Sequence, residues 1–414
     1  MRQLQKYMIL AYLALCPIIY NVTSLDTRKF QELFWQYSVM AIIVTFSRNT
    51  IITAFFFLAI FLEAFNNFSV GQHHIFNLFL GICLFTCARS YFKSFKFQDY
   101  YKPMLFVAIA SMIFMVLQHF NIDPIHSARN NGKFDYSSAF GDKIGLFGIK
   151  THNGIYQALI VPVMLAILGP WGLLALPVVI LSHSMAAVTS AVAGALLYMY
   201  HSSKRIFWIL LTATILFGSI YAVHDYKENK AMFTSRFTLW HAVGKMGLGR
   251  YWGYGPASFD KFTPTKNFMF FGDQNYRIGI GALTGENGVI QGRQTDIVKI
   301  KEYHPNFFKM HKESPNFLKD ANRWGDPHNL FVRIFFEYGF PGLILTYLFF
   351  HELYVRFSSS MKTQELVLIS SMILAFFVAS MTQFPLFVAR LGYIFPLLLG
   401  AFYAVTDERN NRVS

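Results

Sequence analysis

The sequence predicts an all-α polytopic membrane protein. Of its 414 residues, 54% are hydrophobic and only 14% are charged, whereas a soluble domain of this size carries about 25% charged residues. The hydrophobic residues occur in long blocks, not in the alternating or helical-period stripes of half-buried soluble elements. A long polar stretch, 224–328, interrupts the blocks once and predicts a large loop domain on one side of the membrane.

About twelve blocks approach the length of roughly 20 residues that crosses a bilayer as a helix. The blocks are Met8–Val22, Phe30–Phe46, Thr50–Phe65, Ile75–Ala88, Pro103–Phe120, Gly154–Leu168, Trp171–Leu181, Ala186–Tyr200, Ile206–Val223, Leu330–Phe350, Glu365–Met381 and Pro385–Val405. We expect the first block to be a retained span, because it lacks the small-residue cleavage site of a signal peptide. The chain then divides into nine transmembrane helices (1–223), the loop domain (224–328), three helices (329–405) and a tail (406–414).

The basic connections predict the orientation. If the N-terminus is cytoplasmic, the short basic connections Arg89–Lys102, His201–Arg205 and His351–Lys362, and also the C-terminal tail, are cytoplasmic. The long segments Asn121–His152 and Asp225–His328 then lie on the outer side.

Charge and cysteine content exclude several function classes. A formal charge of +14 would suggest nucleic acid in a soluble protein, but anchoring charges and a basic outer loop explain it here, and such a loop implies an anionic ligand. Cys16, Cys83 and Cys87 all lie in apolar blocks, so we expect neither a disulfide framework nor a thiolate metal site. No Walker loop, metal-ligand spacing or nucleophile elbow is present, so we expect no metal and no cofactor.

The principal candidate for chemistry lies where the loop domain ends. Pro327 disfavours a helical conformation for Asp326, so a new element begins here, and we expect a helix over Leu330–Phe350. His328 is then on the first helical turn, at the water boundary. With an ordinary pKa near 6.5, it could remove a proton from a sugar hydroxyl. The alternative is an interfacial histidine that only caps the helix.

Further candidates are cationic or flank the same helix. Arg236 follows Ser235, the expected N-cap of a short surface helix, and its planar guanidinium suits phosphate oxygens, although a solvated surface arginine is the alternative. Arg333 and Glu337 have the i,i+4 spacing of a pair and are expected to bind each other.

Three more positions could contribute to an outer cavity. Arg390 is about 7–8 Å deep in the last block by helix rise, where an arginine faces either a polar interior or the headgroups. Lys150 and His152 precede a membrane block and could join the same cavity, or simply begin the helix. His183 lies in another outer turn and is a weaker candidate.

Three segments together resemble the O-antigen ligase and O-antigen polymerase superfamily. Pro327–Gly342 is similar to its His-Asn…Glu-x-Gly-x-x-Gly signature. Ser235–Phe259 resembles the Arg…Trp…Gly-x-Gly-x-x-x-Phe block that opens the family's periplasmic loop, and Gly148–Pro162 resembles its upstream Gly…Asn…Ala…Pro segment. The resemblance covers roughly residues 145–350, and the whole chain in topology.

The resemblance implies about 12 transmembrane helices, a large periplasmic loop domain before the third-last helix, and a location in the bacterial inner membrane with both termini cytoplasmic. It implies transfer of a glycan from undecaprenyl diphosphate to a saccharide acceptor, in lipopolysaccharide or another surface polysaccharide, without a nucleotide sugar or a metal. His328 becomes the base and Arg236 a diphosphate ligand, and Arg390 matches an arginine of some ligases.

One position departs from the pattern. Ligases of this family carry an arginine where this chain has Met185, so Lys150, His183 or Arg390 takes that role or the subfamily differs. The candidate donor or acceptor contacts are His152, Asn153, His183, Asp326, Asn329 and Glu337. The segment 267–319 matches no motif and is a candidate determinant of acceptor specificity.

Several functions remain open at this point. O-antigen ligase, O-antigen polymerase and protein O-oligosaccharyltransferase share the donor and differ in the acceptor, which is lipid A-core, a growing glycan or a protein. A transporter or flippase for the same lipid-linked glycans is the alternative from another class. It would place ionisable residues near the membrane midplane in two related halves, whereas the candidates here cluster at the outer boundary.

Overall fold

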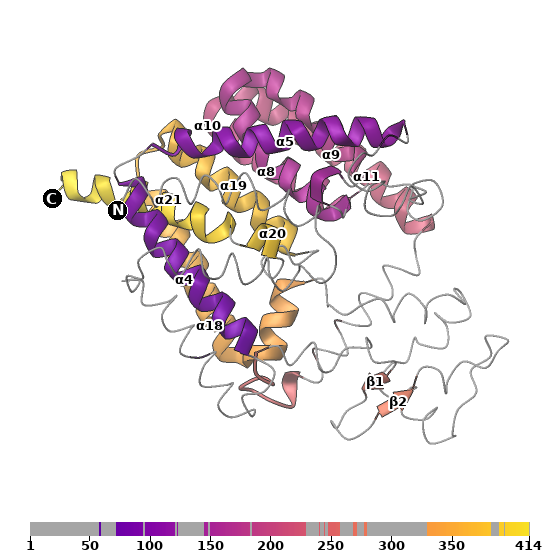
Figure 1. Cartoon of the computed structure of the whole chain (residues 1–414), viewed down its shortest axis with the longest axis vertical. Helices are drawn as coiled ribbons and strands as arrows, with labels where there is room; N and C mark the ends of the chain where they lie inside the picture. The colour runs from indigo at the N-terminus through magenta and orange to yellow at the C-terminus, as the bar shows by residue number, and fades with distance from the viewer. Residues whose placement is uncertain are drawn as a thin grey trace. The chain divides into compact units, whose positions relative to one another are not determined.

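The computed structural model (Figure 1) describes residues 58, 72–93, 96–120, 122, 145–147, 150–182, 184–228, 240, 244, 247–256, 268–270, 277–279, 329–381, 389–392 and 394–413. The described residues within Asn77–Thr212 and His351–Ser414 form one compact unit, and those within Thr50–Phe76 and Ala213–Phe350 form a second. We call these the first and the second unit. The first three predicted membrane blocks lie almost entirely outside the described residues.

The described residues are almost entirely helical, which confirms the helical class. The helices are α4 (Gln72–Phe92), α5 (Gln98–His119), α8 (Lys150–Leu168), α9 (Leu176–Leu181), α10 (Met185–Ser202), α11 (Lys204–Glu228), α18 (Leu330–Ser359), α19 (Gln364–Ser380), α20 (Ala389–Gly392) and α21 (Ile394–Val413), with the 3-10 helices η1 (Gly145–Phe147) and η2 (Gly169–Ala175). One exception lies within the predicted loop domain, where β1 (Phe268–Phe270) and β2 (Arg277–Gly279) pair antiparallel, with Met269 opposite Ile278.

Three described stretches are long and apolar enough to cross a membrane, namely Tyr100–Gln118, Thr151–Leu181 and Leu330–Ser359. Gln364–Ser380 and Ile394–Asp407 are shorter apolar helices. This supports a membrane protein, because apolar stretches of about 20 residues or more can cross the hydrocarbon core of a bilayer.

The core of the first unit is built from α8, α10 and α19, with α5 against α8 and α21 against α19 (Figure 1). Small residues let the backbones approach. A Cβ added at Gly194 of α10 would lie 3.0 Å from the carbonyl oxygen of Ser371 on α19 and 3.1 Å from Pro162 on α8. Packing through small residues is typical of helices that associate in membranes.

The block Trp171–Leu181 does not form a full-length helix of its own. Gly169 has a φ of 58°, and the chain continues as seven residues of η2 and six of α9. At about 2.0 Å and 1.5 Å per residue, these are shorter than a hydrocarbon core of roughly 30 Å. Gly172 packs against the backbone of α8, where a Cβ would overlap the amide nitrogen of Leu165. This short segment therefore packs along α8.

Several helix ends of the first unit meet at one place. The amide of Phe97, before α5, donates to Glu365 Oε1 of α19 at 2.7 Å. Gln364 Nε2 donates to the carbonyl of Ala166 near the end of α8 (3.3 Å) and to the hydroxyl of Tyr198 near the end of α10 (3.2 Å). The starts of α5 and α19 and the ends of α8 and α10 therefore share one side of the unit.

Candidate functional site

The helix that follows His328 in the chain begins as the sequence predicts. α18 starts at Leu330, and the buried Asn329 caps it, because its Oδ1 accepts hydrogen bonds from the amides of Phe331 (3.0 Å) and Val332 (3.1 Å). Such a cap satisfies helix donors that otherwise have no partner. The side-chain oxygen of Asn329, a candidate sugar contact, is thus occupied by hydrogen bonds to the start of the helix. His328 and Asp326 lie outside the described residues.

A buried ion pair lies one turn further along α18. Arg333 Nε donates to Glu337 Oε1 at 2.9 Å, and the two side chains are 4% and 1% exposed. This confirms the predicted pairing. Removing one partner of such a pair leaves an uncompensated buried charge. The stability of this turn of α18 therefore requires both side chains. Glu337, a candidate sugar contact, faces Arg333.

α18 is kinked at Gly339. Gly339 has φ 62° and ψ −155°, outside the helical region, and Pro341 follows. Pro341 has no amide hydrogen, so the carbonyl of Glu337 has no helical donor. The kink also separates the amide of Phe340 from its normal helical acceptor, the carbonyl of Phe336. Three backbone groups of α18 therefore need partners from elsewhere.

The turn Tyr251–Gly255 supplies those partners. Tyr254 N donates to the carbonyl of Phe336 at 2.9 Å and Gly255 N to the carbonyl of Glu337 at 2.8 Å, and the carbonyl of Tyr251 accepts from Phe340 N at 2.9 Å. We call this set of contacts the glycine junction. It joins two of the three segments that resemble the superfamily, although they are far apart in the chain.

The glycines allow this approach. Gly253 has a φ of 78°, and a Cβ there would lie 2.5 Å from the carbonyl oxygen of Glu337. A Cβ on Gly339 would overlap the carbonyl oxygen of Tyr251. The rings of Tyr254 and Phe336 stack beside the backbone contacts, with centroids 4.6 Å apart and planes at 15°. Backbone complementarity and ring stacking together hold the turn against α18.

The third resembling segment lies in the first unit. Asn153, on the first turn of α8, is fully buried, and its Oδ1 accepts from Ser111 Oγ of α5 at 2.6 Å. Ser111 Oγ in turn accepts from the amide of Leu146 (2.9 Å), and Gln118 Oε1 accepts from the amide of Gly145 (2.9 Å). These bonds fix η1 between α5 and α8.

This network gives the candidate Asn153 a structural role, and it includes Ser111 and Gln118, which sequence reasoning missed. Asn153 bonds inside the protein, and its neighbour His152 is half-buried. Ser111 and Gln118 are nearly or fully buried. Polar side chains inside the apolar block Pro103–Phe120 were the available signal.

The remaining candidates are placed only in part. Lys150 begins α8 and Arg390 belongs to α20, and both side chains lie outside what the structure describes, as do Arg236 and His183. Within the described residues, no three His, Cys, Asp or Glu side chains are grouped so that they could hold a metal ion.

Comparison of the chain with family models, with curated proteins and with solved structures finds no match.

Proposed function

We propose that this chain is a membrane glycosyltransferase that moves a glycan from undecaprenyl diphosphate to a saccharide hydroxyl at the periplasmic face. The observation that carries the proposal is the glycine junction. The segments Gly253–Gly255 and Glu337–Gly339 resemble two separate motifs of one superfamily, and three backbone hydrogen bonds join them. Contact between the two segments is what we expect if both motifs belong to one site.

The junction also supports a shared location for the two principal side chains. Arg236 precedes the turn Tyr251–Gly255 in the chain, and His328 directly precedes the cap residue Asn329 of α18. The turn docks on α18, the helix into which the loop domain leads. We infer that Arg236 and His328 act at one site, beside the first turns of α18.

The reaction assigns one role to each side chain. His328 takes the proton of the acceptor hydroxyl, whose oxygen attacks the anomeric carbon of the donor sugar. The bond between that carbon and the diphosphate oxygen breaks, and undecaprenyl diphosphate leaves with the electron pair. Arg236 and Arg390 stabilise the growing negative charge. The diphosphate leaves ionised, so the transfer needs no general acid.

A topology of about twelve helices, with both termini in the cytoplasm of a bacterium, accompanies this proposal. The predicted orientation assigns the starts of α5 and α19 and the ends of α8 and α10 to the cytoplasmic side. These ends meet through the hydrogen bonds of Glu365 and Gln364. Their meeting supports the alternation of the helices, and the loop domain is then periplasmic.

The test follows the release of undecaprenyl diphosphate. Purified chain in nanodiscs receives an undecaprenyl-diphosphate oligosaccharide, EDTA and one acceptor at a time: lipid A-core, a second lipid-linked glycan, or a pilin protein. We expect release with one acceptor and at least a hundredfold loss in His328→Ala, because general base catalysis contributes about 10²–10⁴-fold. The acceptor that supports release identifies the subfamily.

A matched control uses the same helix. His351 is exposed towards the other end of α18, so His351→Ala should keep full activity. Equal thermal unfolding midpoints of the two variants show that both are folded. Release that survives in His328→Ala contradicts the base assignment. Movement of the donor across the bilayer without release identifies a transporter.

A further inference from the structure

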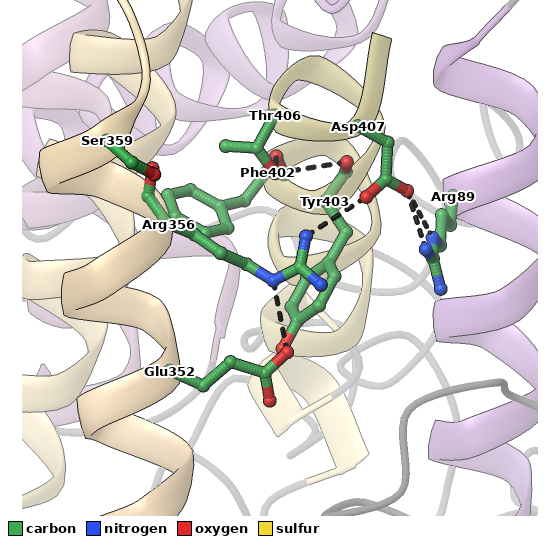
Figure 2. Close-up of polar contacts among 8 residues, drawn as sticks. All are labelled: Arg89, Glu352, Arg356, Ser359, Phe402, Tyr403, Thr406 and Asp407. Carbon is green, nitrogen blue, oxygen red and sulfur yellow. Dashed lines mark hydrogen bonds and ion pairs between the residues drawn. The ribbon is translucent and has the colours of Figure 1, made fainter. Parts of the chain in front are cut away.

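Two clusters of cations lie where helices of the first unit end, and their charge balance differs. In the first (Figure 2), Asp407 of α21 binds Arg89 of α4 at 2.6 Å and Arg356 of α18 at 3.0 Å. Glu352 binds Arg356 at 3.0 Å. Two arginines and two carboxylates balance, and Tyr403 lies beside both guanidinium groups, 5.4 Å from Arg89 and 4.3 Å from Arg356.

The second cluster, which we call the basic corner, consists of His201, Lys204 and Lys362. His201 lies in the last turn of α10, and its ring contacts the ring of Phe357 on α18 with centroids 5.5 Å apart. Lys362, in the connection from α18 to α19, places its ammonium 4.0 Å from the centroid of the same ring. Phe357 therefore brings the histidine and the lysine together from two connections.

Lys204 completes the corner from the start of α11. Its ammonium lies 3.2 Å from the centroid of the Tyr200 ring, and the His201 ring contacts Tyr200 edge-on at 5.0 Å. Lys204 and Lys362 are exposed. The corner thus places two ammonium groups and an imidazole over two aromatic rings. The Lys362 ammonium also donates to the carbonyls of Phe357 and Ser360, which holds it in place and leaves its charge uncompensated by a carboxylate.

Among the described residues, no carboxylate forms an ion pair with His201, Lys204 or Lys362. Glu352 and Asp407 bind the arginines of the first cluster instead. Burial lowers the pKa of His201 from its ordinary value, and the charges of Lys362 and Lys204 lower it further. The repulsion between these groups favours an anion.

We propose that the basic corner binds the phosphate of an anionic phospholipid headgroup. The surrounding side chains fit a membrane interface, because Tyr200 and Trp208 are 43% and 60% exposed, and such aromatic residues concentrate at headgroup level. Basic residues at the cytoplasmic boundary attract anionic lipids. The two connections involved, His201–Arg205 and His351–Lys362, are those that the predicted orientation makes cytoplasmic. The site is independent of glycan transfer and requires only that the chain is embedded in a membrane.

The experiment titrates the purified full-length chain in detergent with phosphatidylglycerol or with phosphatidylcholine of the same acyl chains, and counts bound lipid by native mass spectrometry. Each ammonium that contacts the phosphate should contribute about fivefold to the affinity for anionic lipid. With two such ammonium groups, phosphatidylglycerol should bind about 25-fold tighter than phosphatidylcholine. Lys204→Gln combined with Lys362→Gln should remove this preference, because it weakens phosphatidylglycerol by about 25-fold and leaves phosphatidylcholine unchanged.

The matched control is Lys102→Gln, which removes an exposed lysine from α5, an element that supplies no residue of the corner. It should keep the wild-type preference. If the double variant unfolds, Lys362→Gln alone carries the test, with an expected loss of about fivefold. Equal affinity of the wild type for both lipids, or an unchanged preference in the variants, overturns the proposal. Displacement of phosphatidylglycerol by millimolar inorganic phosphate overturns the assignment to a lipid.

Discussion

At the residue scale, Pro341 and Gly339 together make one backbone carbonyl of α18 available to another segment. Pro341 leaves the carbonyl of Glu337 without a donor, and the positive φ of Gly339 opens the helix so that Gly255 N can reach that carbonyl. The sequence shows both glycine motifs but not that one completes the other. Local patterns specify turns and helices, whereas the match of backbone donors to acceptors distant in the chain appears only in three dimensions.

Gly339→Ala should therefore break the junction. The positive φ costs a non-glycine residue about 1–3 kcal/mol, and the added methyl would overlap the carbonyl oxygen of Tyr251. We expect a lower thermal unfolding midpoint and faster proteolysis near Tyr251. Gly218→Ala is the control, because open space surrounds that helical glycine and alanine favours a helix by up to about 1 kcal/mol. Equal midpoints of the two variants would contradict the proposed role of Gly339.

At the element scale, α18 contains a buried pair whose two roles can be separated. Arg333→Met alone should cost about 3–5 kcal/mol, because Glu337 would remain as a buried charge without its arginine. Combining it with Glu337→Leu should recover most of that loss. The measurement is chemical or thermal unfolding of the single variants and the double variant. Transfer activity in a stable double variant would show that Glu337 is a structural residue, and activity lost despite recovered stability would show a sugar contact.

The cluster of Figure 2 joins three helices through one carboxylate. Asp407→Asn removes the charge that both Arg89 and Arg356 bind, so we expect a loss of about 1–3 kcal/mol in unfolding free energy. Glu352→Gln removes a pair within α18 alone and should cost only about 0.3–0.5 kcal/mol. Similar losses in the two variants would mean that Asp407 does not hold the helices together.

At the scale of the whole molecule, composition predicted the helical class well, because long apolar blocks have few alternatives to helices. The block Leu330–Phe350 begins where α18 begins, although the helix continues to Ser359, since amphipathic turns extend helices beyond their apolar core. Block length did not predict the local structure of Trp171–Leu181, where Gly169 turns the chain and a 3-10 segment comes before the short helix α9. The strand pair near Met269 had no signal strong enough to stand out in the loop domain.

The candidate site was predicted unevenly for a related reason. Pairing of Arg333 with Glu337 follows from helical spacing alone. The buried network of Asn153 with Ser111 depends on the packing of two helices, which a single sequence does not specify. His328 and Arg236 remain predictions. Each precedes, in the chain, one of the two segments that the glycine junction joins.

The stability of the whole protein should depend on pH through His201, and anionic lipid should change that dependence. Its pKa is lowered in the folded protein by burial and by Lys362 and Lys204, so the unfolded chain binds a proton more readily. Above the ordinary pKa near 6.5 the histidine is neutral in both states and has no effect. As the pH falls below 6.5, the unfolded state gains protons first and the folded protein loses stability. A phosphate in the basic corner would raise the pKa of His201 back towards its ordinary value and reduce this loss.

We therefore expect the unfolding temperature of the wild type in phosphatidylcholine nanodiscs to fall more between pH 7.5 and pH 5.5 than that of His201→Gln, since carboxylates titrate alike in both proteins. In nanodiscs that contain phosphatidylglycerol, the difference between the two proteins should shrink. A difference that is absent in phosphatidylcholine would contradict the repulsion between His201 and the lysines, and one that is unaffected by phosphatidylglycerol would contradict binding of the lipid at this corner.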